Sequence, residues 1–289
     1  MLVATHSGPF HADDVFAFAL LRVFVDPKAE VLRTRDLSKL EGADVVIDVG
    51  GEFDPSRKRF DHHQASYRGH RSSAGMVLDW LEDQGRVDPH FAARLRAEWV
   101  DHIDAVDTGR ATPQPNLPTF VTMVSAIAEI GHDDDTWDLA YHAAVTLTES
   151  VLIGLRSAEQ KTNEAMTAVA TAMNAAREKG DRVLRLDQRY KWKRAYFRLG
   201  GASHPSDFVL YPDSDGVRLM AIPPSEDSFA QKRPLPAAWA GLTDAKLSDV
   251  VGVPGARFCH KNRFIAVFDT MEAAEQAIDR WNLNHEDAN

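Results

Sequence analysis

The sequence contains one cysteine, Cys259, in 289 residues. A single cysteine excludes an intramolecular disulfide framework and favours a protein of the reducing cytoplasm. We interpret Cys259 as a small core residue. The sequence also has no zinc-finger spacing, HExxH pair, GxSxG nucleophile elbow, Walker loop or GxGxxG motif. The usual sequence evidence for a zinc peptidase, a serine hydrolase, a P-loop enzyme or a dinucleotide-binding fold is therefore missing.

Excess positive charge and long apolar runs are absent too. The net charge is −10, which disfavours non-specific binding of nucleic acid by a basic surface. It does not exclude a nuclease, because divalent cations bound at a carboxylate site invert the local field. The apolar stretch 15–25 is interrupted by Arg22 and is too short to cross a bilayer, and residues 1–6 lack the features of a signal peptide. We therefore expect a cytoplasmic protein with no membrane partner.

Histidine and aspartate are concentrated near the start of the chain. Four segments carry one or both of them: 5–14, 45–51, 59–64 and 101–109. One such residue at the end of a strand is usually structural, but the recurrence of the same chemistry favours a shared site. Imidazole and carboxylate without thiolate suit Mn, Mg, Zn or Fe. The sequence thus indicates a hard-metal site.

The same segments fall where an α/β fold would place a site. Three segments have the composition of strands: 2–4, 31–35 and 44–49. The last is apolar enough to be buried on both faces of a parallel sheet. Asp13 or Asp14 can cap a helix over 15–21. This order predicts an α/β domain with a mainly parallel sheet, whose functional residues gather at the carboxyl ends of the strands.

The following residues are predicted to be helical as far as residue 179. Helical patterns cover 76–81, 90–106, 120–130 and 136–179, the last long enough for a bent helix or two helices. We place the domain boundary between residues 180 and 181, where Gly180 ends the helical run. Two β-hairpins, at 208–220 and 256–268, and a closing helix over 271–281 then predict a smaller α+β domain of residues 181–289.

The centre of the predicted site is Asp61-His62-His63, which offers a bridging carboxylate and two imidazoles. Other candidates bring the set close to the ligand number that two metal ions need: His6, His11, Asp13 and Asp48. Two such ions would activate a water molecule and clamp the leaving oxygen of a phosphoryl centre. A histidine left over could polarise a phosphate oxygen or protonate the leaving group.

Candidates for substrate binding lie outside this set. Ser73, at the start of the helix after the cluster, could bind a phosphate or belong to an ordinary N-cap, and the sequence favours neither. In the second domain Arg233, His260 and Lys261 could grip phosphates or carboxylates. A solvated loop and a hairpin turn explain these three residues equally well.

The acidic and histidine-rich motifs resemble those of the DHH phosphoesterase superfamily, in segments 5–14, 46–51, 60–64 and 103–109. The match is closer to its Myg-one-like branch, long described as metal-dependent protein hydrolases. The C-terminal half of that branch is matched by segments 232–236, 239–242 and 255–260, so the resemblance covers nearly the whole chain. It implies a DHH-type α/β catalytic domain of residues 1–180, a smaller substrate-binding domain, and phosphoester hydrolysis with Mn²⁺ or Mg²⁺. A eukaryotic branch is described as 3′–5′ RNA exonucleases.

The resemblance also implies a set of metal ligands: His6, His11, Asp13, Asp48, Asp61 and Asp104. It implies that His62 and His63 are ligands or phosphate contacts, and we assign catalytic roles to both and to Asp13. One departure is that His11 stands where the superfamily usually has its first aspartate, with one extra residue after His6. In the fourth motif the choice between Asp104 and Asp107 stays open.

These features predict a cytoplasmic, two-domain phosphodiesterase with a two-metal site. We expect a 3′–5′ exonuclease on short RNA or a hydrolase of small nucleotides, because net acidity favours a short substrate over a long polyanion. A peptidase or amidohydrolase using the same metals is one alternative, weakened by the missing HExxH pair, and a non-catalytic metal-binding module is another. Self-association into a homo-oligomer stays open.

Overall fold

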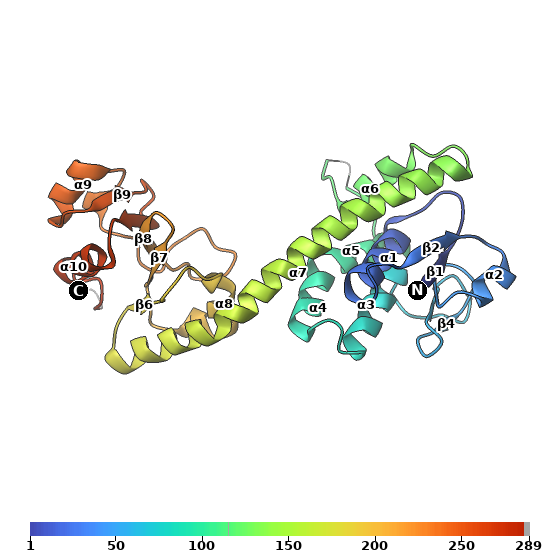
Figure 1. Ribbon diagram of the computed structural model, residues 1–289, viewed down its shortest axis with the longest axis horizontal. Helices are drawn as coiled ribbons and strands as arrows, with labels where there is room; N and C mark the ends of the chain where they lie inside the picture. The colour runs from blue at the N-terminus through green and yellow to red at the C-terminus, as the bar shows by residue number, and fades with distance from the viewer. Residues whose placement is uncertain (115, 286–289) are drawn as a thin grey trace. The chain divides into compact units, whose positions relative to one another are not determined.

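The chain forms two compact units, Met1–Arg156 and Ser157–Asn289 (Figure 1). The computed structural model describes residues 1–114 and 116–285. The division falls inside α7 (Asp134–Lys179), whereas we expected the boundary after residue 180. Packing explains the difference, since Val169 and Met173 of α7 belong to a core of the C-terminal unit. The sequence shows no break in the helix at this point.

A five-stranded sheet forms the centre of the N-terminal unit. Its strands are β1 (Leu2–Thr5), β2 (Glu30–Arg33), β3 (Val45–Ile47), β4 (Phe53–Asp54) and β5 (Arg59–Phe60), in the order β2-β1-β3-β5-β4. All neighbouring strands are parallel except β4, which runs antiparallel to β5. The expected α/β domain with a mainly parallel sheet is confirmed. The sequence analysis missed β4 and β5, because strands of two residues show no periodicity.

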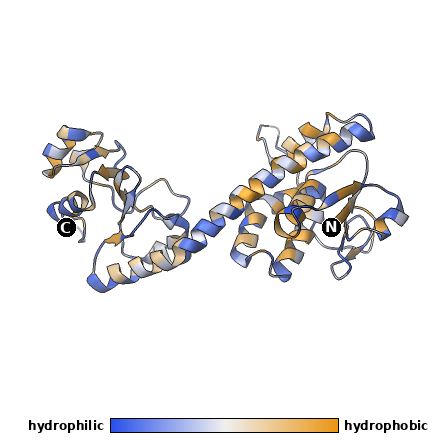
Figure 2. Ribbon diagram, in the orientation of Figure 1, coloured by the Kyte–Doolittle hydropathy of each residue, from blue (hydrophilic) through white to orange (hydrophobic). Residues whose placement is uncertain are grey.

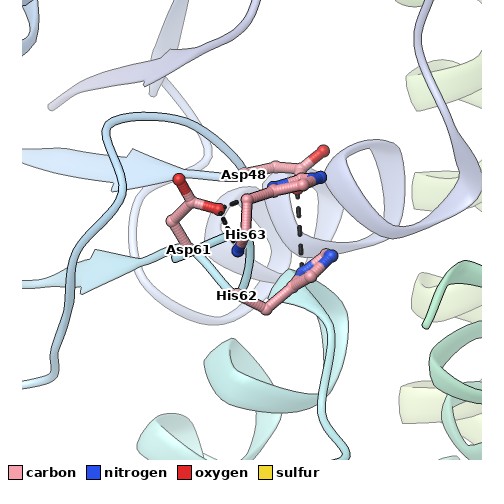
Figure 3. Close-up of side chains that lie close together, drawn as sticks. All are labelled: Asp48, Asp61, His62 and His63. Atoms are coloured by element: carbon pink, nitrogen blue, oxygen red, sulfur yellow. Dashed lines mark hydrogen bonds and ion pairs between the residues drawn. The ribbon is translucent and has the colours of Figure 1, made fainter. Parts of the chain in front are cut away.

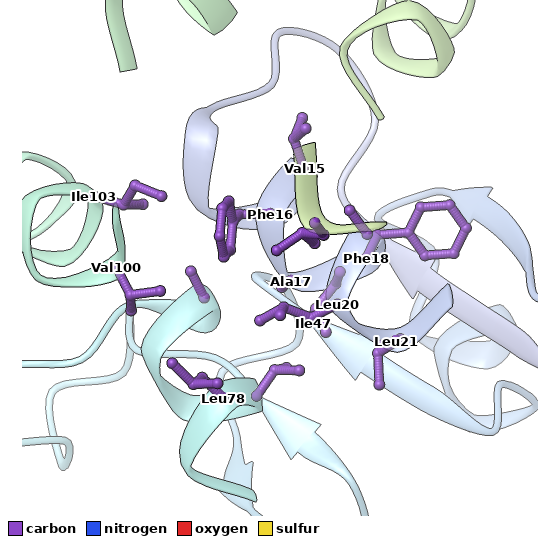
Figure 4. Packing of buried hydrophobic residues seen from close by; sticks show 14 of the residues in the cluster. Val15, Phe16, Ala17, Phe18, Leu20, Leu21, Ile47, Leu78, Val100 and Ile103 are labelled. Atoms are coloured by element: carbon purple, nitrogen blue, oxygen red, sulfur yellow. The ribbon is translucent and has the colours of Figure 1, made fainter. Parts of the chain in front are cut away.

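The helices of this unit surround a buried first helix. They are α1 (Ala12–Phe24), α2 (Leu37–Glu41), α3 (Ser73–Asp83), α4 (Pro89–Leu95), the π-helix η1 (Arg96–Val100), α5 (Asp101–Asp107), α6 (Phe120–Ala128) and the first part of α7. Every residue from Ala12 to Leu21 is buried. Figure 4 shows Phe16 and Phe18 of α1 packed among side chains that include Ile47, Leu78 and Val100. Because residues 15–21 of α1 are all apolar and buried, they hold its N-terminal turn in place after β1.

The C-terminal unit has a sheet of a different kind. Its strands are β6 (Val183–Arg185), β7 (Phe208–Asp213), β8 (Gly216–Ala221), β9 (Ala256–Cys259) and β10 (Ile265–Phe268), in the order β6-β7-β8-β10-β9. Only the pair β6 and β7 is parallel. The helices are α8 (Trp192–Arg198), α9 (Asp244–Val251), α10 (Met271–Arg280) and the 3-10 turns η2 (Gly201–Ser203) and η3 (Ala237–Trp239). The two predicted hairpins and the α+β character are confirmed.

Helix α7 is continuous over 46 residues, not two helices. Figure 2 shows both hydrophilic and hydrophobic residues along α7, with a mainly hydrophilic stretch near its middle. This mixture fits a helix that buries one side and solvates the other. Among residues 1–114 and 116–285, no helix combines the length and the hydropathy that crossing a bilayer requires.

Candidate metal centre

The parallel sheet brings the predicted ligands to one edge. His6 follows β1, Asp48 follows β3 and Asp61 follows β5, while Asp13 lies in the first turn of α1. The carboxyl ends of parallel strands meet at the same edge of a sheet, where such folds bind ligands. A pocket of about 440 Å³ opens there, lined by His6, Pro9, His11, Arg35, Asp48, Val49, Gly50, Asp61 and His63.

A sharp turn after β3 aims Asp48 into this pocket. Asp48 has φ +56°, in the left-handed region that aspartate tolerates better than most residues. Gly50 and Gly51 follow, also with positive φ, where glycine has no steric cost. The turn lets the Gly51 amide donate a 2.6 Å hydrogen bond to the Asp61 carboxylate. The backbone of this loop therefore fixes two of the candidate ligands together.

Asp48, Asp61, His62 and His63 form the first group of candidate ligands (Figure 3). His63 Nδ1 lies 2.8 Å from Asp61 Oδ1 and 3.5 Å from Asp48 Oδ1. His62 Nδ1 lies 3.9 Å from the same Asp48 oxygen, and the two imidazole rings stack with centroids 4.2 Å apart. Both imidazoles thus approach a single carboxylate oxygen of Asp48.

Further groups share members with the first. They are His6, His11 and Asp48; His11, Asp13 and Asp107; and Asp13, Asp14 and Asp48, each with ligand atoms within 4.8 Å of one another. The second oxygen of Asp48 faces His6, with Nε2 3.3 Å from Oδ2. Asp48 therefore belongs to three of the four groups and turns one oxygen to each side, as a bridging carboxylate would.

Several ligand atoms at this edge are buried without a hydrogen-bond partner among the described residues. They include Asp13 Oδ1, Asp14 Oδ2, Asp48 Oδ1 and His62 Nδ1. A buried polar atom left unpaired costs about 1–3 kcal/mol, and more if charged. A divalent cation satisfies several such atoms at once, and oxygen with imidazole nitrogen is the donor set of a hard or borderline metal. The residues present fit a metal centre.

Without a cation, several carboxyl groups of this site have pKa values shifted from the usual range of aspartate. Burial, with the charges of Asp48 and Asp107, raises the pKa of Asp13 well above its usual range. Burial likewise raises the pKa of Asp14 to about 7, against the opposing charge of His6. Asp61 differs: burial raises its pKa, but hydrogen bonds from the Gly51 and His63 amides outweigh burial and leave the pKa lowered. A cation would favour the ionised form of all of them.

The imidazoles respond to the same negative field. Burial alone would lower the pKa of His6, but its hydrogen bond to Asp48 and the charge of Asp14 outweigh burial and raise the pKa. The pKa of His62 is raised in the same way by Asp107, whose Oδ2 lies 3.0 Å from His62 Nε2. A metal would compete with protons for these nitrogens, so its binding is expected to release protons.

Asp104 is in none of these candidate groups, so its expected role as a ligand gains no support from them and stays a prediction. Its Oδ1 accepts hydrogen bonds from the amide and hydroxyl of Ser72 at 3.0 and 2.7 Å, and Arg71 lies 3.2 Å from Oδ2. Asp104 thus caps α3. Asp107, three residues on, shares a candidate group with His11 and Asp13 and is therefore the better candidate of the two that the sequence left open.

Ser73 also has a different environment from the one expected of a phosphate contact. It is fully buried, its hydroxyl donates to the carbonyl of Phe60 at 2.9 Å, and its amide donates to Asp13 Oδ2 at 3.3 Å. Ser73 therefore helps to orient the Asp13 carboxylate through its main-chain amide. Asp14 belongs to one of the candidate groups, although the sequence analysis considered it only as a helix cap. It does accept the His11 amide, at 3.0 Å. Its position next to Asp13 was the feature of the sequence that could have indicated it.

The other expected substrate contacts belong to the C-terminal unit. Arg233 donates to the carbonyl of His285 at 2.7 Å, and its guanidinium lies over the Phe208 ring at 5.6 Å. His260 Nδ1 accepts the Asn262 amide at 3.1 Å, and Lys261 is exposed in the hairpin turn. These contacts hold Arg233 and His260 to their own unit, and a role for all three in substrate binding stays a prediction.

Sequence comparisons assign a family. The chain matches, over residues 2–279, the family MYG1_exonuc, described as an uncharacterised protein family (UPF0160). The MYG1 protein of Chlamydia muridarum is 40% identical over 283 residues, which cover 96% of this chain and 95% of that protein. The human protein named MYG1 exonuclease is 31% identical over 312 residues, which cover 94% of this chain and 83% of the human one.

Solved structures give weaker similarities. RecJ from Thermus thermophilus in complex with Mn²⁺ is 13% identical with a TM-score of 0.28, covering 97% of this chain and 52% of that chain. An exonuclease RecJ bound to manganese is 13% identical with a TM-score of 0.29, covering 96% of this chain and 88% of that chain. Scores this low do not establish a common fold, and the family assignment rests on the sequence matches.

Proposed function

The chain belongs to the MYG1_exonuc family, and we propose that it is a divalent-metal-dependent phosphodiesterase, either a 3′–5′ exonuclease on short RNA or a hydrolase of small nucleotides. The observation that carries the proposal is the set of buried, unpartnered ligand atoms on Asp13, Asp48 and His62. Relatives named exonuclease support the reaction class.

In a two-metal site Asp48 would help to hold both cations, because one of its oxygens faces His6 and the other faces His62 and His63. Asp61 and His62 would complete one side, and Asp13 and Asp107 the other. A pair of Mn²⁺ or Mg²⁺ ions bound there would supply a hydroxide near neutral pH and neutralise the phosphate oxygens. The protein's share is to hold these ligands in place before the substrate arrives, which it does through main-chain hydrogen bonds and burial.

His63 is the member of the centre placed to meet the substrate. Its side chain is 63% exposed, while that of Asp48 beside it is 2% exposed. Asp61 accepts from both its amide and its Nδ1, which fixes the ring at the mouth of the pocket. We assign His63 to a phosphate oxygen or to the leaving group. Arg35, exposed on the pocket wall, adds a positive charge for the same phosphate.

The test is hydrolysis of bis-p-nitrophenyl phosphate and of a 5′-labelled RNA oligomer after removal of metal with EDTA and return of Mn²⁺ or Mg²⁺. We expect activity only with metal, and shortening of the RNA one nucleotide at a time from its 3′ end. Asp48→Asn should lose both activity and bound metal. Asp135→Asn, which removes an exposed carboxylate at the start of α7, is the matched control and should lose neither.

Two results would overturn the proposal. One is a metal-loaded protein that cleaves neither substrate, and the other is cleavage of a peptide or amide with no turnover of phosphodiesters. Internal cuts in the RNA would retain the phosphodiesterase and remove the exonuclease.

A further inference from the structure

A second pocket, of about 500 Å³, lies wholly within the C-terminal unit. It forms where α7 meets the segment between β6 and α8, and it is lined by Lys161, Glu164, Gln188, Arg189, Tyr190 and Lys191. None of these residues belongs to the metal centre. The lining contains three cations and one carboxylate, in a chain whose net charge is −10.

The lysines of this pocket are not neutralised. Lys161 and Lys191 are both exposed, and neither is within ion-pair distance of a carboxylate in the described parts of the chain, 1–114 and 116–285. Arg189 lies 3.3 Å from Asp213, although its side chain is 64% exposed. Glu164, three residues after Lys161 on α7, is the one opposing charge of the lining.

Neighbouring arginines of the same segment behave differently. Arg185 is paired with Glu275 at 2.6 Å and Arg194 with Glu226 at 2.7 Å. These pairs hold the segment to its own unit and leave little charge for a ligand. Among the cations of the lining, Lys161 and Lys191 are therefore the ones available to a ligand, since Arg189 lies beside Asp213.

An aromatic ring completes the lining. Tyr190 is half-buried, and its hydroxyl accepts a 2.8 Å hydrogen bond from the Gln188 amide. Sites for single-stranded nucleic acid combine cations that follow the phosphates with aromatic rings on which bases stack. Acidic peptides are better matched by arginine forks, which bind carboxylates in bidentate fashion. Here the unpaired cations are lysines, which act as point charges and suit phosphate.

We propose that this pocket binds the phosphate backbone of a single-stranded nucleic acid at phosphates other than the one that is hydrolysed. The proposal rests on the proposed function for the identity of the substrate. It predicts that the chain's affinity for an oligonucleotide depends on Lys161 and Lys191, and that this dependence persists when the metal centre is disabled. Counterion release makes such binding weaker as salt rises.

The experiment measures binding of a fluorescein-labelled 12-nucleotide RNA to the full chain carrying Asp48→Asn, in EDTA, over a range of salt concentrations. Adding Lys161→Glu and Lys191→Glu should lower the affinity on the order of 10-fold and reduce the slope of log K against log salt by about 1–2. Lys161→Gln with Lys191→Gln should act in the same direction but less. Each single glutamate variant is compared with Lys246→Glu, which makes the same change of charge at an exposed lysine of α9 outside the pocket.

A second readout uses the active protein. The ratio of kcat/KM on the 12-mer to kcat/KM on bis-p-nitrophenyl phosphate should fall in the double variant and stay unchanged in Lys246→Glu. The proposed function and the proposed pocket can fail independently. A chain that binds RNA through these lysines but cleaves nothing refutes only the phosphodiesterase. A chain that cleaves RNA with the ratio and the affinity unaltered refutes only the pocket.

Three further outcomes would overturn the pocket's assignment. Equal loss of affinity in Lys246→Glu would show a general charge effect. Competition by polyglutamate as strong as by unlabelled RNA would indicate an acidic protein segment as the ligand. Loss of affinity in the glutamate variants but none in the glutamine variants would show that added negative charge, not a lost contact, was responsible.

Discussion

The two units each have a five-stranded sheet, yet they differ in whether their buried carboxylates are paired. The N-terminal unit buries Asp13, Asp14 and Asp48 beside one another, with an oxygen of each left unpartnered among the described residues. The C-terminal unit pairs both buried carboxylates of its described residues: Asp207, 4% exposed, lies 2.9 Å from Arg182, and Glu159 accepts from Arg198 at 3.0 Å. Parallel strand ends concentrate like charges at one edge, whereas hairpins spread charges along the surface. The first unit therefore depends on a cation for its balance, and the second does not.

The largest expected effect comes from removing a ligand. Asp61→Ala should lower kcat on a phosphodiester at least about a hundredfold, since ~3 kcal/mol in the barrier corresponds to that factor. Its fold should persist, so that circular dichroism stays unchanged while metal content falls. The matching change in the other unit, Asp207→Asn, breaks a buried pair and should cost about 3 kcal/mol of stability while metal content stays at the wild-type level. Full activity in folded Asp61→Ala would refute the metal mechanism.

Metal binding should also distinguish the two units by their stability. At a Mn²⁺ concentration near 100 times Kd, the N-terminal unit should gain about 2.7 kcal/mol. That gain corresponds to a rise in Tm of roughly 5–10 °C over the EDTA-treated protein, measured by calorimetry. Asp48→Asn should show little of this rise. An equal rise in that variant would mean that the cation binds elsewhere.

Asp104 and Asp107 allow the comparison to be made within one helix. Asp107→Ala should weaken Mn²⁺ binding by at least about tenfold with a smaller loss of stability, because it removes a charge from the centre. Asp104→Ala should do the reverse, costing about 1–3 kcal/mol by leaving donors of Ser72 unpaired while the number of bound ions is retained. Isothermal titration and denaturant unfolding measure the two effects. Loss of metal in Asp104→Ala alone would restore the original assignment.

Much of this arrangement follows from local patterns in the sequence. The strand before Asp48 is an apolar run, and the helix after Asp13 is apolar all round, so both predictions needed only residues close in the chain. The choice between Asp104 and Asp107 could not be made in this way. Both lie on α5, and what distinguishes them is that Ser72 approaches Asp104 while His62 approaches Asp107.

The unit boundary and the contacts of Ser73 could not be predicted from the sequence for the same reason. Helix α7 continues without a break through the boundary, and its second part joins the C-terminal unit only through the side chains it meets there. Ser73 begins a helix as predicted, but its hydroxyl is used by the Phe60 carbonyl, a contact between distant residues. Patterns along the sequence indicate periodicity and helix caps. They do not indicate which distant group accepts a hydrogen bond from a given donor.

The smallest expected effect concerns a histidine of the C-terminal unit. Burial lowers the pKa of His204, whose ring lies 3.0 Å from the Met173 carbonyl and 2.8 Å from the Ser206 hydroxyl. The unfolded chain then binds a proton more readily than the folded one, so stability falls as the pH drops below about 6.5. In His204→Gln this component should vanish, changing the Tm difference between pH 8 and pH 5.5 by about 1–2 °C. An unchanged difference would mean that His204 titrates alike in both states.

Tolerance to mutation should differ sharply between two of the ligands. Asp61 is supported by the main-chain amides of Gly51 and His63, which any residue other than proline retains. The amide of residue 51 would therefore still reach Asp61 after substitution of Gly51, provided that its positive φ is accommodated. Asp48 has no comparable support, because its own left-handed backbone places it. Substitution should therefore be tolerated more readily at residue 51 than at residue 48, where asparagine keeps the turn but not the charge.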